Sequence, residues 1–512
     1  MVRKNDVLTG KVLSFGSDGE GVVRMEECVF FIPYALPGEE IEFRAVKVKG
    51  NTGYGKIERI LSVSPDRVQP LCPVFHTCGG CLLQHASYEC QREFKREKVR
   101  LALKKIGGVE AEVQPVEACS SPYGYRNKLQ LPVGVDASGK TVIGFYAERS
   151  HRIVPIERCA IHPKWSAVLI ATFQKYLAAT GVKGYDEVTK KGLIRHLVAR
   201  EIDGEYLITV VATAKTLPQE ELLVRLFEEA FPRCSVYINV NKSSSNVIFG
   251  DVFKLLCGKG RIVGETGGVK YEAGAETFVQ VNPEIREKLY ARAIEACFFD
   301  GAQTVIDAYS GGGLLTALAA KRAERAYGIE LNGEASACAD ELKKKNGLTN
   351  MTNICGDVAE ILPEIMQREC GRKIALILDP PRAGVARSVL YAILRSGIER
   401  FVMISCNPST LARDLGILTG SLRERNGELV KIGAESAKTA ESTKPSEIAK
   451  NAAAVAAFET ADTVGTASTA ESAETERRDT ETFTYFQIDR VEPFDMFPQT
   501  KHVETLITLC RK

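Results

Sequence analysis

A cysteine and an aspartate each directly follow an apolar segment that predicts a β-strand. Cys406 follows RFVMIS, and Asp379 follows LIL. If both segments are parallel strands, their carboxyl ends lie at the edge of the sheet where open α/β folds bind ligands. A helix predicted to begin after Cys406 would lower the pKa of the thiol and favour the thiolate. The pair predicts a nucleophile beside a ligand site, although an isolated cysteine is more often a buried residue without a chemical role.

A further carboxylate near the C-terminus could act as a base. The segment PFDMFPQTKHVET (493–505) places His502 and Glu504 among apolar and aromatic residues. A glutamate in such surroundings is either a surface residue or a group retained for proton transfer. The second interpretation requires the fold to bring Glu504 to Cys406.

A glycine-rich turn between a strand and a helix predicts a nucleoside-binding loop. It lies in VIDAYSGGGLLTALAA (305–320), and the N-terminus of the following helix would supply N–H donors. Its spacing differs from the GxGxxG of dinucleotide-binding enzymes. Glu330 ends the next strand, where a carboxylate would bind ribose hydroxyls, and Asp357 closes a third strand, where adenine contacts are common. S-adenosylmethionine, a nucleoside without a pyrophosphate, fits this pattern better than a dinucleotide, and an α/β domain without a nucleotide is the alternative.

Three cysteines, Cys72, Cys78 and Cys81, form a C-x5-C-x2-C cluster typical of metal ligands. Three later cysteines could each supply a fourth thiolate: Cys90, Cys119 and Cys159. Four thiolates suit either an iron–sulfur cluster or structural zinc.

Size and composition limit the possible classes of protein. A chain of 512 residues is too long for one core and predicts about two to four domains. The net charge of +2 excludes a polycation, so any nucleic-acid affinity must come from local basic patches. The chain has no apolar signal segment and no apolar run of about 18 residues, so neither secretion nor a membrane span is expected. The 15 cysteines, an odd number, favour free thiols in a reducing cytoplasm.

The elements that would position these residues fall into three predicted domains. Five short alternating runs in residues 1–65 predict an OB-like barrel. Residues 66–265 predict an α+β domain with a clear helix near 219–230, and the helix near 88–118 could pack on the catalytic domain. Four cations of the barrel could face phosphates or simply be solvated: Arg44, Lys47, Lys49 and Lys56.

The third predicted domain covers residues 266–512. Apolar strands alternate there with helical stretches, which predicts a doubly wound parallel sheet closed by an antiparallel pair near the C-terminus. Within it, residues 424–481 are rich in Ala, Thr, Ser and Glu, and we interpret them as a disordered insertion. A basic segment at 91–105 predicts an amphipathic helix that could touch RNA or solvent.

The chain resembles the RNA 5-methyluridine (uracil-C5) methyltransferases, specifically the iron–sulfur members that act on 23S ribosomal RNA. The resemblance spans nearly the whole chain apart from 424–481. Four motifs carry it: FVQVNP (278–283), DPPRAG (379–384), SCNPSTLARDL (405–415) and DMFPQTKHVE (495–504). It implies an N-terminal TRAM domain that binds RNA and a Rossmann-like methyltransferase domain with a mixed seven-stranded sheet.

The resemblance also implies a mechanism and its residues. Cys406 would add to C6 of a flipped-out uridine, C5 would take the methyl group of S-adenosylmethionine, and Glu504 would remove the C5 proton. The implied cofactor residues are Gln280, Tyr309, Glu330 and Asp379, together with Asp357, which matches less closely. The implied ligands of a [4Fe–4S] cluster are Cys72, Cys78, Cys81 and Cys159. Leu314 departs from the family, since some relatives carry a polar residue there, which could remove one cofactor contact.

Three other functions remain open. A cytosine-C5 methyltransferase would share the thiolate addition, but it needs a Pro-Cys nucleophile, and Cys406 follows a serine. A non-catalytic RNA-binding protein would not need the carboxylates and the glycine loop together. Within the family, the substrate could be the T-loop uridine of tRNA. For the RNA methyltransferase we expect RNA as partner, no membrane, a cytoplasmic protein and a monomer, whereas the cytosine-C5 enzyme could act on DNA or RNA.

Overall fold

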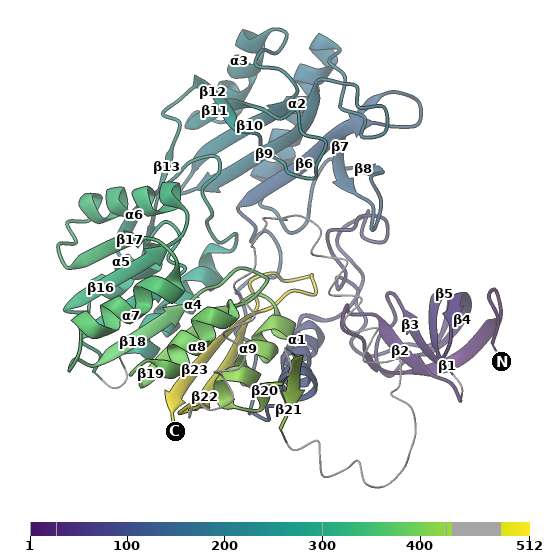
Figure 1. Ribbon diagram of the computed structural model, residues 1–512. Coiled ribbons are helices and arrows are strands. Elements are labelled where there is room, and N and C mark those ends of the chain that lie inside the picture. Colours follow the sequence, from purple (N-terminus) through teal and green to yellow (C-terminus); the bar gives the residue numbers. More distant parts are fainter. Residues whose placement is uncertain (1, 27, 299–300, 426–427, 433–482) are drawn as a thin grey trace.

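The computed structural model describes residues 2–26, 28–298, 301–425, 428–432 and 483–512. Its first five strands form a closed barrel in the order β1-β2-β3-β5-β4 at one side of the molecule (Figure 1), and Phe15 of the barrel packs against Phe94 with ring centroids 5.0 Å apart. The barrel encloses aromatic and aliphatic side chains, including Phe30 and Phe43, because alternate residues of each strand point inward. This agrees with the predicted five-stranded barrel. Its strands are β1 (Val7–Phe15), β2 (Gly21–Arg24), β3 (Val29–Ile32), β4 (Glu40–Lys49) and β5 (Thr52–Ser62).

A long helix follows the barrel and packs on the distant C-terminal part of the chain. α1 (Tyr88–Ala102) begins at Ser87, whose hydroxyl caps it, and continues into a π-helical turn, η1 (Leu103–Gly107). The helix packs against α9 (Pro408–Thr419) and β22 (Phe486–Phe494). Segments about 400 residues apart therefore lie together, as in the 408-residue separation of Gln91 and Gln499.

The central part of the chain is a mixed seven-stranded sheet in the order β12-β11-β10-β9-β6-β7-β8. Two helices pack on it through apolar side chains such as Phe173 and Phe227. The helix predicted near 219–230 is confirmed as α3, whereas α2 was not predicted. The elements are β6 (Lys128–Val135), β7 (Thr141–Tyr146), β8 (Ile153–Pro155), α2 (Trp165–Thr180), β9 (Ile194–Ile202), β10 (Glu205–Ala212), α3 (Glu220–Ala230), β11 (Cys234–Val240) and β12 (Val252–Cys257).

A second seven-stranded sheet, in the order β17-β16-β15-β18-β19-β23-β22, forms the C-terminal part. The first five strands in this order are parallel, and β23 and β22 complete the sheet as antiparallel neighbours, which confirms the predicted mixed sheet. The strand order reverses between β15 and β18, where open sheets of this kind bind ligands. The strands are β15 (Thr304–Ala308), β16 (Arg325–Glu330), β17 (Met351–Cys355), β18 (Ile374–Leu378), β19 (Arg400–Ser405), β22 and β23 (Glu504–Arg511).

Helices cover both faces of this sheet and bury two apolar cores (Figure 1). One face carries α4, α5 and α6, and the other carries α7, α8 and α9 together with α1. Among the described residues, none of the helices combines the length and apolar character needed to cross a bilayer. The bounds are α4 (Pro283–Cys297), α5 (Leu314–Ala320), α6 (Gly333–Lys345), α7 (Val358–Arg368) and α8 (Arg387–Arg395).

Two short hairpins complete the described chain. β13 (Ile262–Thr266) pairs with β14 (Val269–Ala273) before the second large sheet begins. β20 (Leu422–Arg425) pairs with β21 (Glu428–Lys431), so the first residues of the predicted disordered insertion are strands instead. The rest of that predicted insertion, residues 426–427 and 433–481, lies outside the described residues.

Candidate active site

The sheet brings Cys406 and Glu504 to the same place. β19 and β23 are antiparallel, and Ser405 pairs with Thr505. Cys406 follows Ser405 and Glu504 precedes Thr505, so the two residues lie across from each other at the next step of the ladder. Neighbouring antiparallel positions are about 5 Å apart. The sequence left this proximity undecided, and the strand register provides it.

The thiol of Cys406 is less acidic than its position suggested. It is partly exposed and stands just before α9, whose N-cap residue, Asn407, accepts a hydrogen bond from Ser409 N at 3.1 Å. Burial, and then the negative charge of Glu504, nevertheless raise the pKa of Cys406 to about 11. The prediction that the helix N-terminus lowers this pKa is therefore wrong, because desolvation and a facing carboxylate outweigh the helix.

Glu504 and Asp379 are carboxylates with strongly raised pKa values. Burial, followed by the charge of Asp379, raises the pKa of Glu504 to about 8, and its side chain is almost fully buried. Burial raises the pKa of Asp379 to about 7 at the end of β18. A carboxylate with a pKa near neutrality can gain and release a proton under ordinary conditions. The two residues therefore suit acid–base chemistry, and Asp379 is also one of the residues predicted to bind the cofactor.

Arg382 is a residue of this site that the sequence analysis did not single out. Its positive charge lowers the pKa of both Cys406 and Glu504, opposing the effect of burial. The loop that carries it is tied to the start of α9, since its carbonyl accepts hydrogen bonds from Asn407 at 3.2 Å and Thr410 at 3.2 Å. The DPPRAG motif contained this arginine, so a search for cations near the nucleophile could have found it.

The glycine-rich loop turns sharply between β15 and α5. Tyr309 has a positive φ of 68°, which is rare outside glycine and marks a strained position of the kind found at ligand sites. A Cβ at Gly311 or Gly312 would project into open space, whereas one at Gly313 would approach Ala339 Cβ to 2.6 Å. The loop thus packs tightly against α6 on one side and leaves its other side free for a ligand.

Acidic residues surround this loop at the ends of the strands. Glu330 accepts hydrogen bonds from Gly311 N and Asn332 N, both at 2.8 Å, which fixes its carboxylate at the end of β16. Asp357 is exposed and caps α7 by accepting a hydrogen bond from Ala359 N at 2.7 Å. Gln280 is buried in the segment that leads into α4. The five predicted cofactor positions, with Tyr309 and Asp379 included, therefore lie at or just after the carboxyl ends of strands or just before α4.

Four of the cysteines line one cavity of about 330 Å³. They are Cys72, Cys78, Cys81 and Cys159, and neither Cys90 nor Cys119 lines it. Burial raises the pKa of the Cys81 thiol to about 12 and that of Cys159 to about 11, and the charges of the other cysteines add to both shifts. In the part of the chain that the structure describes, no three His, Cys, Asp or Glu side chains stand in metal-coordinating geometry. The four thiols therefore line a common cavity, but they are not arranged as the ligands of a single metal ion.

The same cavity extends to the active-site loops. Arg382 and His502 line it together with the cysteines. Burial lowers the pKa of His502 to about 3, so this imidazole is neutral at physiological pH. The cysteine site and the site of Cys406 and Glu504 are therefore neighbours.

Comparison with known proteins identifies the relatives of this chain. Residues 259–425 match the family model described as tRNA (Uracil-5-)-methyltransferase. An uncharacterized RNA methyltransferase of Halalkalibacterium halodurans is 38% identical over 421 residues, which cover 81% of this chain and 92% of the relative. One from Clostridium acetobutylicum is 30% identical over 516 residues, covering 100% of this chain and 98% of that protein.

A solved structure extends this similarity to the whole fold. The crystal structure of Pyrococcus abyssi tRNA (uracil-54, C5)-methyltransferase in complex with S-adenosyl-L-homocysteine matches with a TM-score of 0.69 and 25% identity. The match covers 98% of this chain and 99% of the other. With the relatives above, it shows that the chain belongs to the family of RNA methyltransferase enzymes that includes the tRNA (uracil-5-)-methyltransferases.

Proposed function

We propose that the protein transfers a methyl group from S-adenosylmethionine to C5 of a specific uridine in RNA, through a covalent bond between Cys406 and C6. One observation carries this proposal: the strand register sets Cys406 opposite Glu504 at the edge of the sheet that also holds the glycine loop. A nucleophile, a base and a nucleoside site on one edge are the parts that this reaction needs.

The chemistry follows from what each residue can do. Uracil C5 is a poor nucleophile, and addition of the Cys406 sulfur to C6 converts the ring into an enolate. S-adenosylmethionine supplies the methyl group, which C5 takes. Glu504 then removes the C5 proton, and the electrons of the C–H bond re-form the C5–C6 double bond as the sulfur leaves. Arg382 assists the first step, because its charge favours the thiolate over the thiol.

Five residues would hold the cofactor: Gln280, Tyr309, Glu330, Asp357 and Asp379. Glu330 is the residue best suited to the ribose hydroxyls. A carboxylate oxygen accepts more than one hydrogen bond, so the bonds from Gly311 N and Asn332 N leave further acceptor capacity. Those two bonds also hold the carboxylate in one orientation beside the free side of the loop.

We expect Glu330→Ala to weaken the binding of S-adenosylmethionine by roughly 10- to 100-fold, because hydrogen bonds to a charged group are worth about 1.5–3 kcal/mol each. Isothermal titration calorimetry with S-adenosylhomocysteine measures this change. Glu334→Ala is the matched control, since Glu334 is an exposed carboxylate in the first turn of α6, directly after the β16 end that carries Glu330. If Glu330→Ala binds S-adenosylhomocysteine with unchanged affinity, Glu330 is not a cofactor-binding residue.

The four cysteines that share the cavity would hold a [4Fe–4S] cluster. Four thiolates are the usual ligands of such a cluster, and the cavity of about 330 Å³ offers a common space for it. The bound irons would stabilise the thiolates, whose pKa values burial otherwise raises. Zinc is the alternative with the same donors.

We expect protein purified without oxygen to contain iron and acid-labile sulfide, and Cys159→Ser to lose most of both. Cys119→Ser is the control, because Cys119 lies outside the cavity and bonds to Ser121 O at 2.9 Å. Elemental analysis and a sulfide assay measure the two contents. If the wild-type protein contains zinc and no sulfide, the four cysteines bind a structural zinc ion and not an iron–sulfur cluster.

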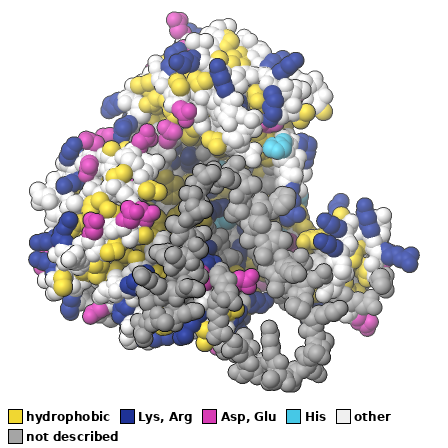
Figure 2. All heavy atoms as spheres, viewed as in Figure 1, with side chains coloured by type: hydrophobic (Ala, Val, Ile, Leu, Met, Phe, Trp, Pro, Cys, Tyr) yellow, Lys and Arg dark blue, Asp and Glu magenta, His cyan; other side chains and the backbone are white. Residues whose placement is uncertain are grey.

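The resemblance to the iron–sulfur members favours 23S ribosomal RNA as the substrate. The barrel would act as a TRAM domain that contacts the RNA backbone, since Arg44, Lys47, Lys49 and Lys56 are exposed on β4 and β5. Figure 2 shows basic side chains on the barrel. The similarity to the Pyrococcus abyssi tRNA enzyme favours tRNA as the second candidate.

The experiment that tests the function uses methyl-labelled S-adenosylmethionine with 23S ribosomal RNA and with tRNA, followed by digestion and mass spectrometry of the nucleosides. Label in 5-methyluridine from ribosomal RNA supports the full proposal, and label from tRNA alone reassigns the substrate. Label in 5-methylcytidine, or in no nucleoside, contradicts uridine methylation.

A further inference from the structure

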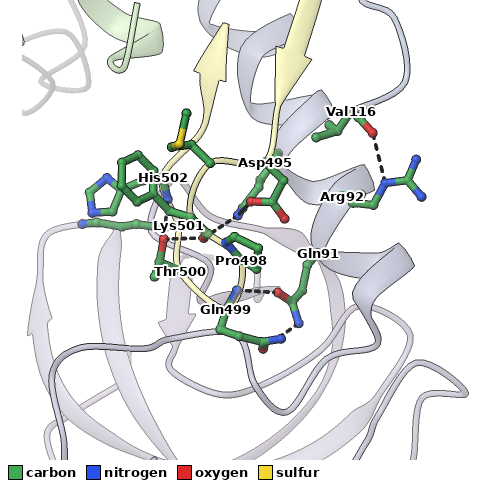
Figure 3. Close-up of polar contacts among 12 residues, drawn as sticks. Gln91, Arg92, Val116, Asp495, Pro498, Gln499, Thr500, Lys501 and His502 are labelled. Atoms are coloured by element: carbon green, nitrogen blue, oxygen red, sulfur yellow. Dashed lines mark hydrogen bonds and ion pairs between the residues drawn. The ribbon is translucent and has the colours of Figure 1, made fainter. Parts of the chain in front are cut away.

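The loop that leads into Glu504 is held by the N-terminal third of the chain. It joins β22 to β23 and runs from Asp495 to Val503. Phe494 pairs with Glu504, so the loop leaves and re-enters the sheet at adjacent positions. The placement of Glu504 therefore depends on the placement of this loop, and Figure 3 shows the loop lying against α1.

A buried ion pair fastens the start of the loop to α1. Lys95 Nζ lies 2.6 Å from Asp495 Oδ1, and both side chains are fully buried. The same ammonium group donates a hydrogen bond to Phe497 O at 2.9 Å. A buried ion pair is often no more stabilising than apolar residues of the same size, and a role in fixing position is one reason for a fold to keep it.

Gln91 fastens the middle of the loop one helical turn away. Its Nε2 donates to Gln499 Oε1 at 3.0 Å, and Gln499 N donates back to Gln91 Oε1 at 3.0 Å (Figure 3). Gln499 has a positive φ of 70°, a conformation that persists only when its surroundings hold it. Its carbonyl also accepts hydrogen bonds from Leu82 N and Leu83 N, directly after Cys81. The loop is therefore hydrogen-bonded both to α1 and to the segment that follows Cys81.

We infer that Lys95, Asp495 and Gln91 are positioning residues for the removal of the C5 proton. All three side chains are buried between α1 and the loop, and they act by fixing the loop that sets the carboxylate of Glu504 opposite Cys406. This inference rests on the proposed function. The inference predicts that the two steps of the reaction can be separated. Addition of Cys406 to the base depends on β19 and α9, which position the thiol, whereas proton removal depends on the β22–β23 loop, which positions Glu504.

The test is the double variant Lys95→Met/Asp495→Leu, which replaces the ion pair by apolar side chains and leaves no unpaired buried charge. Two rates are measured: adduct formation with RNA containing 5-fluorouridine, which stops before proton removal, and turnover on ordinary RNA. We expect the adduct to form at the wild-type rate and turnover to fall roughly 10- to 100-fold, as misplacement of a catalytic group by about 1 Å does. The methylated enzyme–RNA adduct should then accumulate on ordinary RNA.

Two further variants make the outcome decisive. Gln91→Met removes the paired amide bonds to Gln499 together with the bond that Gln91 Nε2 donates to Ala86 O at 2.9 Å, and it should show the same separation of the two rates if the double variant does not fold. Arg325→Met is the control, because it breaks an ion pair with Glu369 at the opposite end of the sheet, 2.7 Å apart. Equal losses in both rates, or no loss in either, would assign the ion pair to the fold alone. If the wild-type protein forms no adduct, the proposed function fails instead.

Discussion

Cys406→Ala is expected to abolish methylation of RNA, with activity falling below detection. The variant lacks the sulfur that converts C5 into a nucleophile, and losing a covalent nucleophile removes the reaction path itself. Binding of S-adenosylmethionine should be unchanged, because the glycine loop and Glu330 lie on other strands.

Mass spectrometry of protein incubated with 5-fluorouridine RNA and S-adenosylmethionine identifies the nucleophile directly. Fluorine at C5 cannot leave as a proton, so the covalent adduct accumulates on the peptide that contains Cys406. Cys370→Ala is the matched control, since Cys370 is exposed and follows α7 away from the active-site edge. An adduct that persists in Cys406→Ala, or is absent from the wild type, would overturn the mechanism.

Glu504→Gln is expected to stop the reaction one step later. Addition and methyl transfer should proceed, while removal of the C5 proton slows by roughly 100- to 10,000-fold, the usual contribution of a positioned base. The methylated RNA should therefore stay attached to Cys406 on ordinary uridine substrates, without fluorine. Glu399→Gln, an exposed residue at the opposite end of β19, should turn over normally.

The pH dependence of turnover follows from the same residue. The pKa of Glu504 is raised to about 8, so the carboxylate is mostly protonated at neutral pH and must ionise before it can accept a proton. We expect kcat, which includes removal of the C5 proton after the irreversible methyl transfer, to rise about tenfold per pH unit below this pKa. Ionisation of the Cys406 thiol, whose pKa is about 11, should make kcat/KM rise with pH as well, because addition to C6 precedes methyl transfer. A profile that falls between pH 6 and 8 would contradict the assignment of Glu504 as base.

Local patterns were sufficient for most of the architecture. The alternation of apolar residues predicted the barrel, the helix α3 and the closing pair β22 and β23, because each depends on a run of neighbouring residues. α2 was missed because its exposed face is itself largely apolar, with Val168, Ala171 and Ala178, so it lacks the polar face that reveals amphipathic helices. The start of the predicted insertion was wrong for a related reason: the hairpin β20–β21 is short and polar.

Chemistry that depends on distant contacts was harder to predict. The sequence determined by itself which residue types stand at strand ends: Cys406, Asp379 and Glu330, with the glycine turn between them. Only the tertiary structure decided that Glu504 faces Cys406, since this follows from the register of β19 on β23. It also decided that Cys159, and neither Cys90 nor Cys119, shares a cavity with the cluster cysteines.

The acidity of Cys406 illustrates the physical reason. A helix N-terminus is a local feature that can be read from neighbouring residues, and it favours the thiolate. Burial and the charge of Glu504 come from segments far away in the chain, and they raise the pKa instead. Local sequence determines which groups are present and on which elements, whereas desolvation and charge depend on everything packed around a group, and only the folded chain specifies those surroundings.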